Sequence, residues 1–140
     1  GLKPGDRIAL MMPNLLQYPI AIFGAIRAGV IVVNTNPLYT PREMEFVFTN
    51  ADVKAIVIVE NFASNLEKIL AKTKIEIVIT TSIGELVGGV KGKFIDFMVK
   101  YVKCLVPKFN IPNAIDFTTA LDHGKKYKKV PFKTNREKNI

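Results

Sequence analysis

Four short apolar runs recur at a nearly constant interval, and this spacing constrains the fold more than any other feature of the chain. They are Arg7–Met12, Val30–Asn34, Lys54–Val59 and Glu76–Thr80. Runs such as IVVN and AIVIV are continuously apolar rather than alternating, which is typical of strands buried on both faces of a parallel sheet. Each interval is long enough for a helix, so the pattern predicts an α/β fold of βαβ units with right-handed crossovers.

Helix signals fill the intervals between the apolar runs. The segment Gln17–Ala28 is apolar and stops at Gly29, a residue suited to the position after a helix. A second helix is predicted from Thr40 to about Asn50, because Thr40 can cap it, Pro41 suits its first turn and Glu43 completes a capping box. A shorter helix is expected over Asn65–Thr73.

The rhythm breaks after Thr80. Glycines at 84, 88, 89 and 92 indicate a loop, followed by a predicted helix over 91–106 that Pro107 ends. From Gly92 onward its charged side chains form one narrow stripe, and the rest of its surface is apolar. The stripe consists of Lys93, Asp96, Lys100 and Lys103. Such a helix suits either an anionic lipid surface or packing on its own domain with the lysines in water.

The chain divides into two parts of one expected domain. Residues 1–82 form the βαβ core, and residues 83–140 form a basic helical segment and connector. Within the second part, Ala114–His123 reads as a short helix stopped by Gly124, and the lysine-rich tail over 125–140 reads as a solvated connector.

The net charge of +8 lies entirely in residues 91–140, since residues 1–90 hold eight basic and eight acidic side chains. We expect no nucleic-acid partner, because no basic motif with interleaved aromatic residues is present. No apolar run has the length of a membrane-spanning helix. The single cysteine, Cys104, cannot form an internal disulfide, which is compatible with a reducing cytosol.

The residues alone predict no catalytic site and no metal site. The glycines and lysines of Gly88–Lys93 match no phosphate-loop spacing, so a flexible turn is expected. His123 lacks a nucleophile or metal partner and reads as a solvent-facing helix end. Cys104 is expected in the core or an interface, on the apolar face of the 91–106 helix. The twelve carboxylates are scattered and form no metal-ligand cluster.

The segment RIALMMPNLLQYPIAIFGAIRAGVIVVNTNPLYTPREMEFVFTNADVKAIVIV carries a family resemblance. Its R-A-G turn at residues 27–29, its N-P-L-Y-T-P-R-E motif at residues 36–43 and the later stretch Phe97–Lys108 resemble the adenylate-forming enzymes, specifically bacterial long-chain fatty-acid–CoA ligases. The resemblance extends from Gly1 to about Lys129 and implies a partial N-terminal domain of such an enzyme, built from Rossmann-like βαβ units.

The resemblance implies that a parent enzyme converts a carboxylate and ATP·Mg²⁺ into an acyl-adenylate, and then uses the thiol of CoA to form a thioester. The family's ATP loop, adenine-binding motif, ribose-binding Asp and catalytic Lys have no counterpart here. We therefore expect an internal fragment, inactive alone and without bound cofactor, whose partners are the rest of the ligase chain, fatty acid and CoA. Exposed apolar surface would favour self-association of the fragment.

The resemblance places one group of residues near a ligand. The loop before the capped helix lies near the CoA entry path in related enzymes, and here it consists of Asn36, Pro37, Leu38 and Tyr39. The alternative is a purely structural loop and cap in which Tyr39 packs inward. A cytoplasmic enzyme, with a peripheral position on the inner membrane face, is expected. The alternative function is a stand-alone α/β module that binds a nucleotide or a membrane surface.

Overall fold

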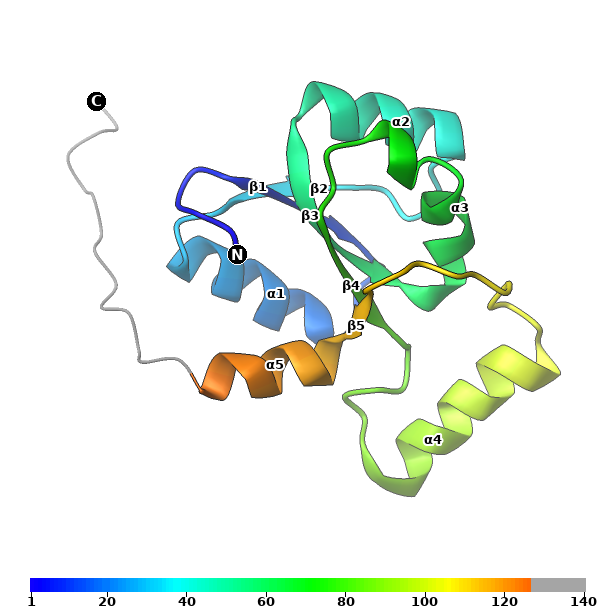
Figure 1. Ribbon diagram of the computed structural model, residues 1–140. Helices are drawn as coiled ribbons and strands as arrows, with labels where there is room; N and C mark the ends of the chain where they lie inside the picture. The colour runs from blue at the N-terminus through cyan, green and yellow to red at the C-terminus, as the bar shows by residue number, and fades with distance from the viewer. Residues whose placement is uncertain (127–140) are drawn as a thin grey trace.

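The four apolar runs form strands of one parallel sheet in the computed structural model, which describes residues 1–126 (Figure 1). The strands lie within one residue of their predicted bounds, and a short fifth strand joins them. They are β1 (Arg7–Met11), β2 (Ile31–Asn34), β3 (Val53–Val59), β4 (Ile77–Thr81) and β5 (Ile115–Asp116). The order is β2-β1-β3-β4-β5, and every neighbouring pair is parallel, which confirms the predicted sheet.

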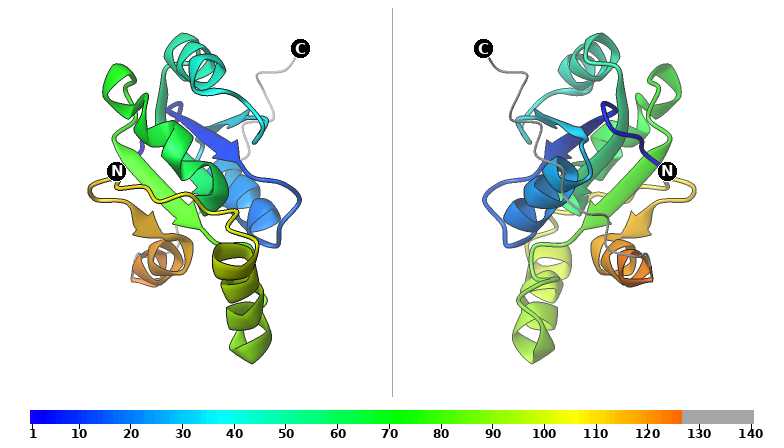
Figure 2. Two further views of the ribbon diagram at one scale, coloured as in Figure 1. Left: turned by 90° about the vertical axis from the view of Figure 1, so that its right-hand side faces the viewer. Right: turned by 90° about the vertical axis from the view of Figure 1, so that its left-hand side faces the viewer.

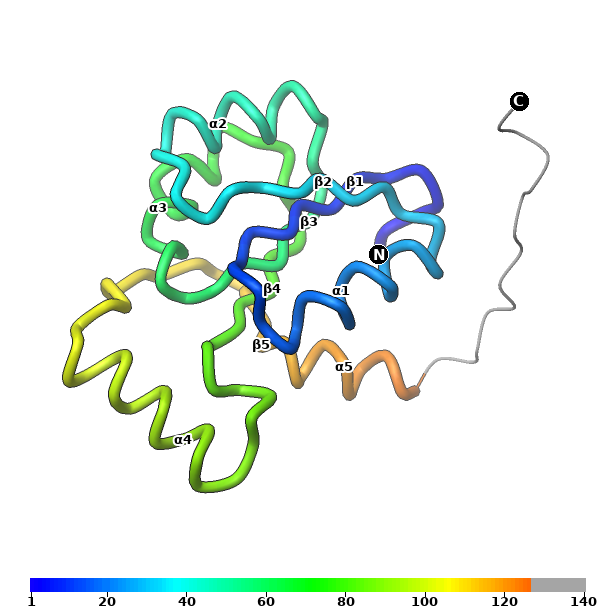
Figure 3. Tube along the Cα trace, turned by 180° about the vertical axis from the view of Figure 1, so that it is seen from behind, coloured from blue at the N-terminus to red at the C-terminus, as the bar shows by residue number. Residues whose placement is uncertain are grey.

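Helices cover both faces of the sheet. The helices are α1 (Gln17–Arg27), α2 (Pro41–Asn50), α3 (Ala63–Glu67), α4 (Gly89–Phe97) and α5 (Phe117–Lys125). Helices α1 and α5 lie side by side on one face, and α2 and α3 cover the other (Figures 1 and 3). Helix α4 extends away from these layers.

The continuous apolar strands explain the two-faced core. On β1, Ala9 and Met11 pack toward α2 and α3, while Ile8 and Leu10 pack toward α1 and α5. Each of these four side chains is at most 8% exposed. A strand that must be apolar on both faces cannot show the alternation of a half-exposed strand.

Three helix predictions need correction. In place of one helix over 65–73, the structure has the end of α3 and a 3₁₀ turn, Leu70–Lys72; another 3₁₀ turn, Glu60–Phe62, precedes α3. The Ile69 N–H donates to the Leu66 carbonyl at 3.0 Å, a bond between residues three apart that is typical of a 3₁₀ turn. Helix α5 continues through Gly124, whose backbone does not take the left-handed conformation that ends helices, whereas Gly29 does, with φ of 72°.

The helix predicted over 91–106 starts earlier and ends earlier. Gly89 begins α4, so the expected flexible turn at Gly88–Lys93 is wrong for all but its first residue. The helix passes into a single π-helical turn, Met98–Val102, where the Lys103 N–H donates to the Met98 carbonyl at 2.9 Å. Cys104 follows with φ of 48°, a conformation that no helix continues.

The described part of the chain ends just after α5. The predicted connector at 125–140 lies outside the described residues except for Lys125 and Lys126. No helix within residues 1–126 has the length and apolarity needed to cross a bilayer.

Candidate functional site

The carboxyl edge of the sheet is the candidate site, because open parallel sheets bind ligands outside the carboxyl ends of their strands. The strand order reverses between β1 and β3, and the crevice of such a fold opens at this reversal. The loops that leave β1, β2, β3 and β4 all begin at this edge. They hold the predicted ligand loop and most of the polar contacts described below.

The loop at residues 36–39 is a compact turn after β2. The Asn36 carboxamide oxygen accepts the Leu38 N–H at 3.0 Å, and the Asn36 carbonyl accepts the Tyr39 N–H at 3.1 Å. Tyr39 packs against the core cluster on the α2 side, and Pro37 is half-buried. Leu38 is 76% exposed and is the side chain that this turn presents to solvent.

A capping box fixes the end of this loop. The Thr40 N–H donates to Glu43 Oε2 at 2.8 Å, and the Glu43 N–H donates to Thr40 Oγ1 at 3.4 Å. The hydrogen bonds from the backbone and hydroxyl of Thr40 lower the pKa of the Glu43 carboxyl. The Asn36 carboxamide oxygen and the side chains of Thr40 and Glu43 are therefore engaged locally, and Tyr39 packs inward as the structural interpretation requires.

A polar network that the sequence did not predict joins α1, β4 and α5. Gln17 is 1% exposed, and its Nε2 donates to Thr81 Oγ1 and to the Ser82 carbonyl, both at 2.9 Å. Thr81 Oγ1 donates to Glu85 at 2.6 Å, and Glu85 accepts the N–H and the hydroxyl of Thr118 at 2.9 Å. No buried side-chain nitrogen or oxygen among residues 1–126 lacks a partner. The network therefore positions the helices around the edge.

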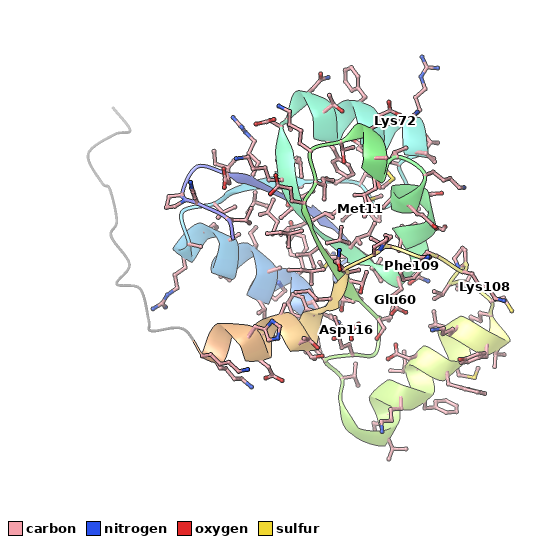
Figure 4. The ribbon with its side chains drawn as sticks, viewed as in Figure 1. Met11, Glu60, Lys72, Lys108, Phe109 and Asp116 are labelled. Atoms are coloured by element: carbon pink, nitrogen blue, oxygen red, sulfur yellow. The ribbon has the colours of Figure 1, made fainter. Side chains whose placement is uncertain are left out.

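A second polar cluster lies where β3 and β4 lead toward α4. Asp96 accepts the Ser82 hydroxyl at 2.8 Å and the Gly84 N–H at 2.7 Å. Beside it is a cavity of ≈ 220 Å³ that Glu60, Asn61 and Lys100 also line. Figure 4 labels Glu60 and Asp116 at this edge of the sheet.

Burial dominates the electrostatics of Glu60. It raises the pKa of the Glu60 carboxyl, and Lys100 acts in the opposite direction. Asp96 and Asp116 add to the rise, because like charges disfavour ionisation of a neighbouring carboxyl. Glu60 was not singled out by the sequence, since nothing in the run VENF distinguishes it from any carboxylate that follows a strand.

The remaining candidates contribute no chemistry at this edge. His123 is exposed near the end of α5, as predicted. Cys104 is exposed, so its predicted place in the core is wrong, and its place in an interface stays a prediction. It lies beyond the helix whose apolar face it was expected to share. Within residues 1–126, no group of three His, Cys, Asp or Glu side chains could hold a metal ion.

Comparison with known proteins agrees with the geometry. Residues 1–95 match the model of the family described as AMP-binding enzyme. Long-chain-fatty-acid–CoA ligase from Salmonella typhimurium is 57% identical over 124 residues, which are 89% of this chain and 22% of that protein. The ligase of the same description from Haemophilus influenzae is 52% identical over 136 residues, 97% of this chain and 24% of that protein. The chain thus spans about a fifth to a quarter of the length of these relatives.

Solved structures show the same fold. A long-chain-fatty-acid–CoA ligase from Archaeoglobus fulgidus superposes with a TM-score of 0.56 at 23% identity, over 68% of this chain and 18% of that chain. A benzoate CoA ligase from Burkholderia xenovorans superposes with a TM-score of 0.54 at 26% identity, over 67% of this chain and 18% of that chain.

Proposed function

The chain belongs to the family of AMP-binding enzymes, and from this membership we propose that it serves in a long-chain-fatty-acid–CoA ligase. The 57% identity over 89% of the chain to a ligase of that description carries the proposal. The proposed reaction activates a fatty acid with ATP·Mg²⁺ to an acyl-adenylate and transfers the acyl group to the thiol of CoA. Adenylation replaces a poor leaving group with AMP, and cations offset the phosphate charge.

Residues 1–126 do not fit ATP or Mg²⁺. The glycine-rich stretch at 88–93 matches no phosphate-loop spacing, and the described residues hold no metal-ligand group. Parts of the ligase other than these residues would hold both. We assign this chain a structural role in the ligase, in contact with the rest of the enzyme. Fatty acid and CoA are the substrates of the whole enzyme.

For CoA, we propose that the loop of Asn36, Pro37, Leu38 and Tyr39 borders its path. The position of this loop supports the proposal. The loop follows β2 at the carboxyl edge of the sheet, and β2 pairs with β1, the strand beside which the strand order reverses. Since only the carboxamide oxygen of Asn36 is engaged within the loop, contact would come from the Asn36 amide nitrogen, the exposed Leu38 side chain and the backbone. We also propose a cytoplasmic enzyme that works at the inner face of a membrane, and self-association of the isolated chain through its exposed apolar side chains.

A chimera tests the proposed ligase function. Residues 1–126 of this chain replace the matching segment of the Salmonella typhimurium ligase, and formation of palmitoyl-CoA from palmitate, ATP and CoA is measured. We expect activity within about tenfold of the parent ligase, a loss of about 1.4 kcal/mol or less in transition-state stabilisation. This chain alone should release no pyrophosphate.

The control chimera carries Ala9→Glu, which buries a charge in the sheet at a residue that is 0% exposed, and should be inactive. A chimera that folds with the melting behaviour of the parent ligase and makes no thioester would contradict the proposal. So would turnover by the 140-residue chain alone, because that would place the chemistry within it.

A further inference from the structure

Helix α4 presents its apolar face to solvent. Figure 2 shows α4 extending beyond the sheet and away from the layers of the other helices. The outward side chains are large and apolar, spaced by four, three and four residues, the repeat of one helix face. They are Val90, Phe94, Phe97 and Tyr101, with exposed fractions of 85%, 63%, 53% and 64%. We refer to these four residues as the α4 stripe.

The opposite side of α4 holds the helix to the body of the protein. Gly92 is buried against Gly84, and a Cβ on either glycine would run into the backbone oxygen of the other. Asp96 accepts hydrogen bonds from Ser82 and Gly84. The contacts at Gly92 and Asp96, one turn apart, fix which face points inward. The α4 stripe therefore points outward because of specific packing.

The charge around the stripe has a single sign. Residues 89–108 hold five lysines and one carboxylate, and that carboxylate, Asp96, is engaged with Ser82 and Gly84. Lys91 and Lys93 fall on either side of the stripe at 100° per residue, and Lys103 follows the last turn. Lys100 lines the cavity with Glu60 and is directed to that side of the helix.

An aromatic stripe bordered by lysines matches one kind of surface. The cores of protein interfaces are depleted in lysine, whereas interfacial helices combine Phe-rich faces with flanking lysines that reach lipid headgroups. The rings of Phe97 and Tyr101 lie 5.3 Å apart and form a continuous apolar ridge. Helix α1 also exposes apolar side chains, Phe23 among them, but its only charged residue is Arg27. Of these two exposed apolar helix faces, only that of α4 is bordered by several lysines.

We propose that the α4 stripe is a docking surface for an anionic lipid bilayer, with Phe94, Phe97 and Tyr101 entering the interface and Lys91, Lys93 and Lys103 binding headgroups. The inference rests on the proposed function only for its biological setting, a ligase whose substrate is a fatty acid. Binding to lipid requires neither ATP nor CoA, so a failure of this proposal is distinguishable from a failure of the ligase proposal.

The test is flotation of the full chain with vesicles of phosphatidylcholine, with or without phosphatidylglycerol, at low and high salt. We expect at least tenfold tighter binding to the anionic vesicles, lost at high salt. The variant K91Q/K93Q/K103Q should lose on the order of 100-fold in affinity, since each lysine near an anionic surface contributes about fivefold. The variant Phe94→Ser with Phe97→Ser should lose at least about tenfold.

The matched control is Phe23→Ser with Phe46→Ser, which removes two phenylalanines that are both 69% exposed on α1 and α2. Circular dichroism confirms that each variant is folded, and the control should bind as the parent does. Equal binding to neutral and anionic vesicles, or equal losses in the α4 variant and the control, would overturn the proposal. If the parent chain binds no vesicles and forms a dimer that Phe94→Ser with Phe97→Ser dissociates, the α4 stripe is instead a contact between two copies of this chain.

Discussion

Replacing Gln17 with methionine tests whether one buried amide holds α1 against the end of β4. The Gln17 side chain is 1% exposed, and its Nε2 donates to Thr81 Oγ1 and the Ser82 carbonyl at 2.9 Å. Methionine fills a similar volume, so the change removes the hydrogen bonds with little change in packing. Thr81 keeps its bond to Glu85, and the Ser82 carbonyl loses its 2.9 Å bond from Gln17.

The expected loss follows from these two bonds. Each contributes about 1 kcal/mol net, so the free energy of unfolding should fall by about 2 kcal/mol. At roughly 3 °C per kcal/mol for a domain of this size, the melting temperature should fall by about 6 °C. Urea unfolding followed by circular dichroism measures the first quantity, and a thermal scan measures the second.

The neighbouring Tyr18→Phe variant is the control. It removes a hydrogen bond of 2.7 Å to Asn34 that water can replace, because the bond is exposed. We expect a loss of about 0.5 kcal/mol or less from it. A Gln17→Met variant within about 0.5 kcal/mol of the parent would refute the assignment, because an unmade buried hydrogen bond costs more than that. Equal losses of unfolding free energy in the two variants would refute the claim that burial makes the Gln17 hydrogen bonds more stabilising than the exposed one.

Two carboxylates should show opposite pH dependence. Thr40 lowers the pKa of Glu43, so the contribution of the Glu43 carboxylate to stability is present above the ordinary pKa. It is lost as pH falls through the lowered folded-state pKa. The difference in melting temperature between the parent and Glu43→Ala should therefore shrink in acid. The pKa of Glu60 is raised by burial, so stability from its bound proton is present below the ordinary pKa and is lost as pH rises through the raised folded-state pKa. Glu60→Gln should melt above the parent at neutral pH and together with it in acid, and a pH-independent difference for either variant would contradict the corresponding assignment.

The strands and the cap of α2 could be predicted because their causes are local. Continuous apolar runs identified β1 to β4 within one residue, since burial on both faces requires apolar residues at successive positions. The Thr40–Glu43 capping box formed as predicted, because both partners lie within four residues of each other. The fifth strand has two residues, too few to give a pattern of any period.

The contacts that shape the candidate site could not be predicted, because their partners lie far apart in sequence. Gln17 and Thr81 are separated by 64 residues, and Glu85 and Thr118 by 33. The sequence placed the loop at residues 36–39 near the carboxyl edge, but which of its atoms remain available depends on the turn that the chain adopts. That turn engages the Asn36 side chain and leaves Leu38 exposed. Assignment of this loop to CoA remains a prediction.

Helix α4 shows where helical periodicity stops being informative. The periodicity identified Lys93, Asp96 and Lys100 as one charged stripe, and in a globular domain such a stripe faces water while the apolar face packs inward. Here Asp96 is bonded to the body of the protein, whereas Lys93 and Lys100 remain exposed and much of the apolar surface is exposed as well. The departure at Asp96 comes with the Gly84–Gly92 contact, because a close backbone contact decides which face a helix turns inward. Apolar residues on this helix therefore cannot be assigned to the core from their spacing, and their exposure is the observation that favours lipid over interior packing.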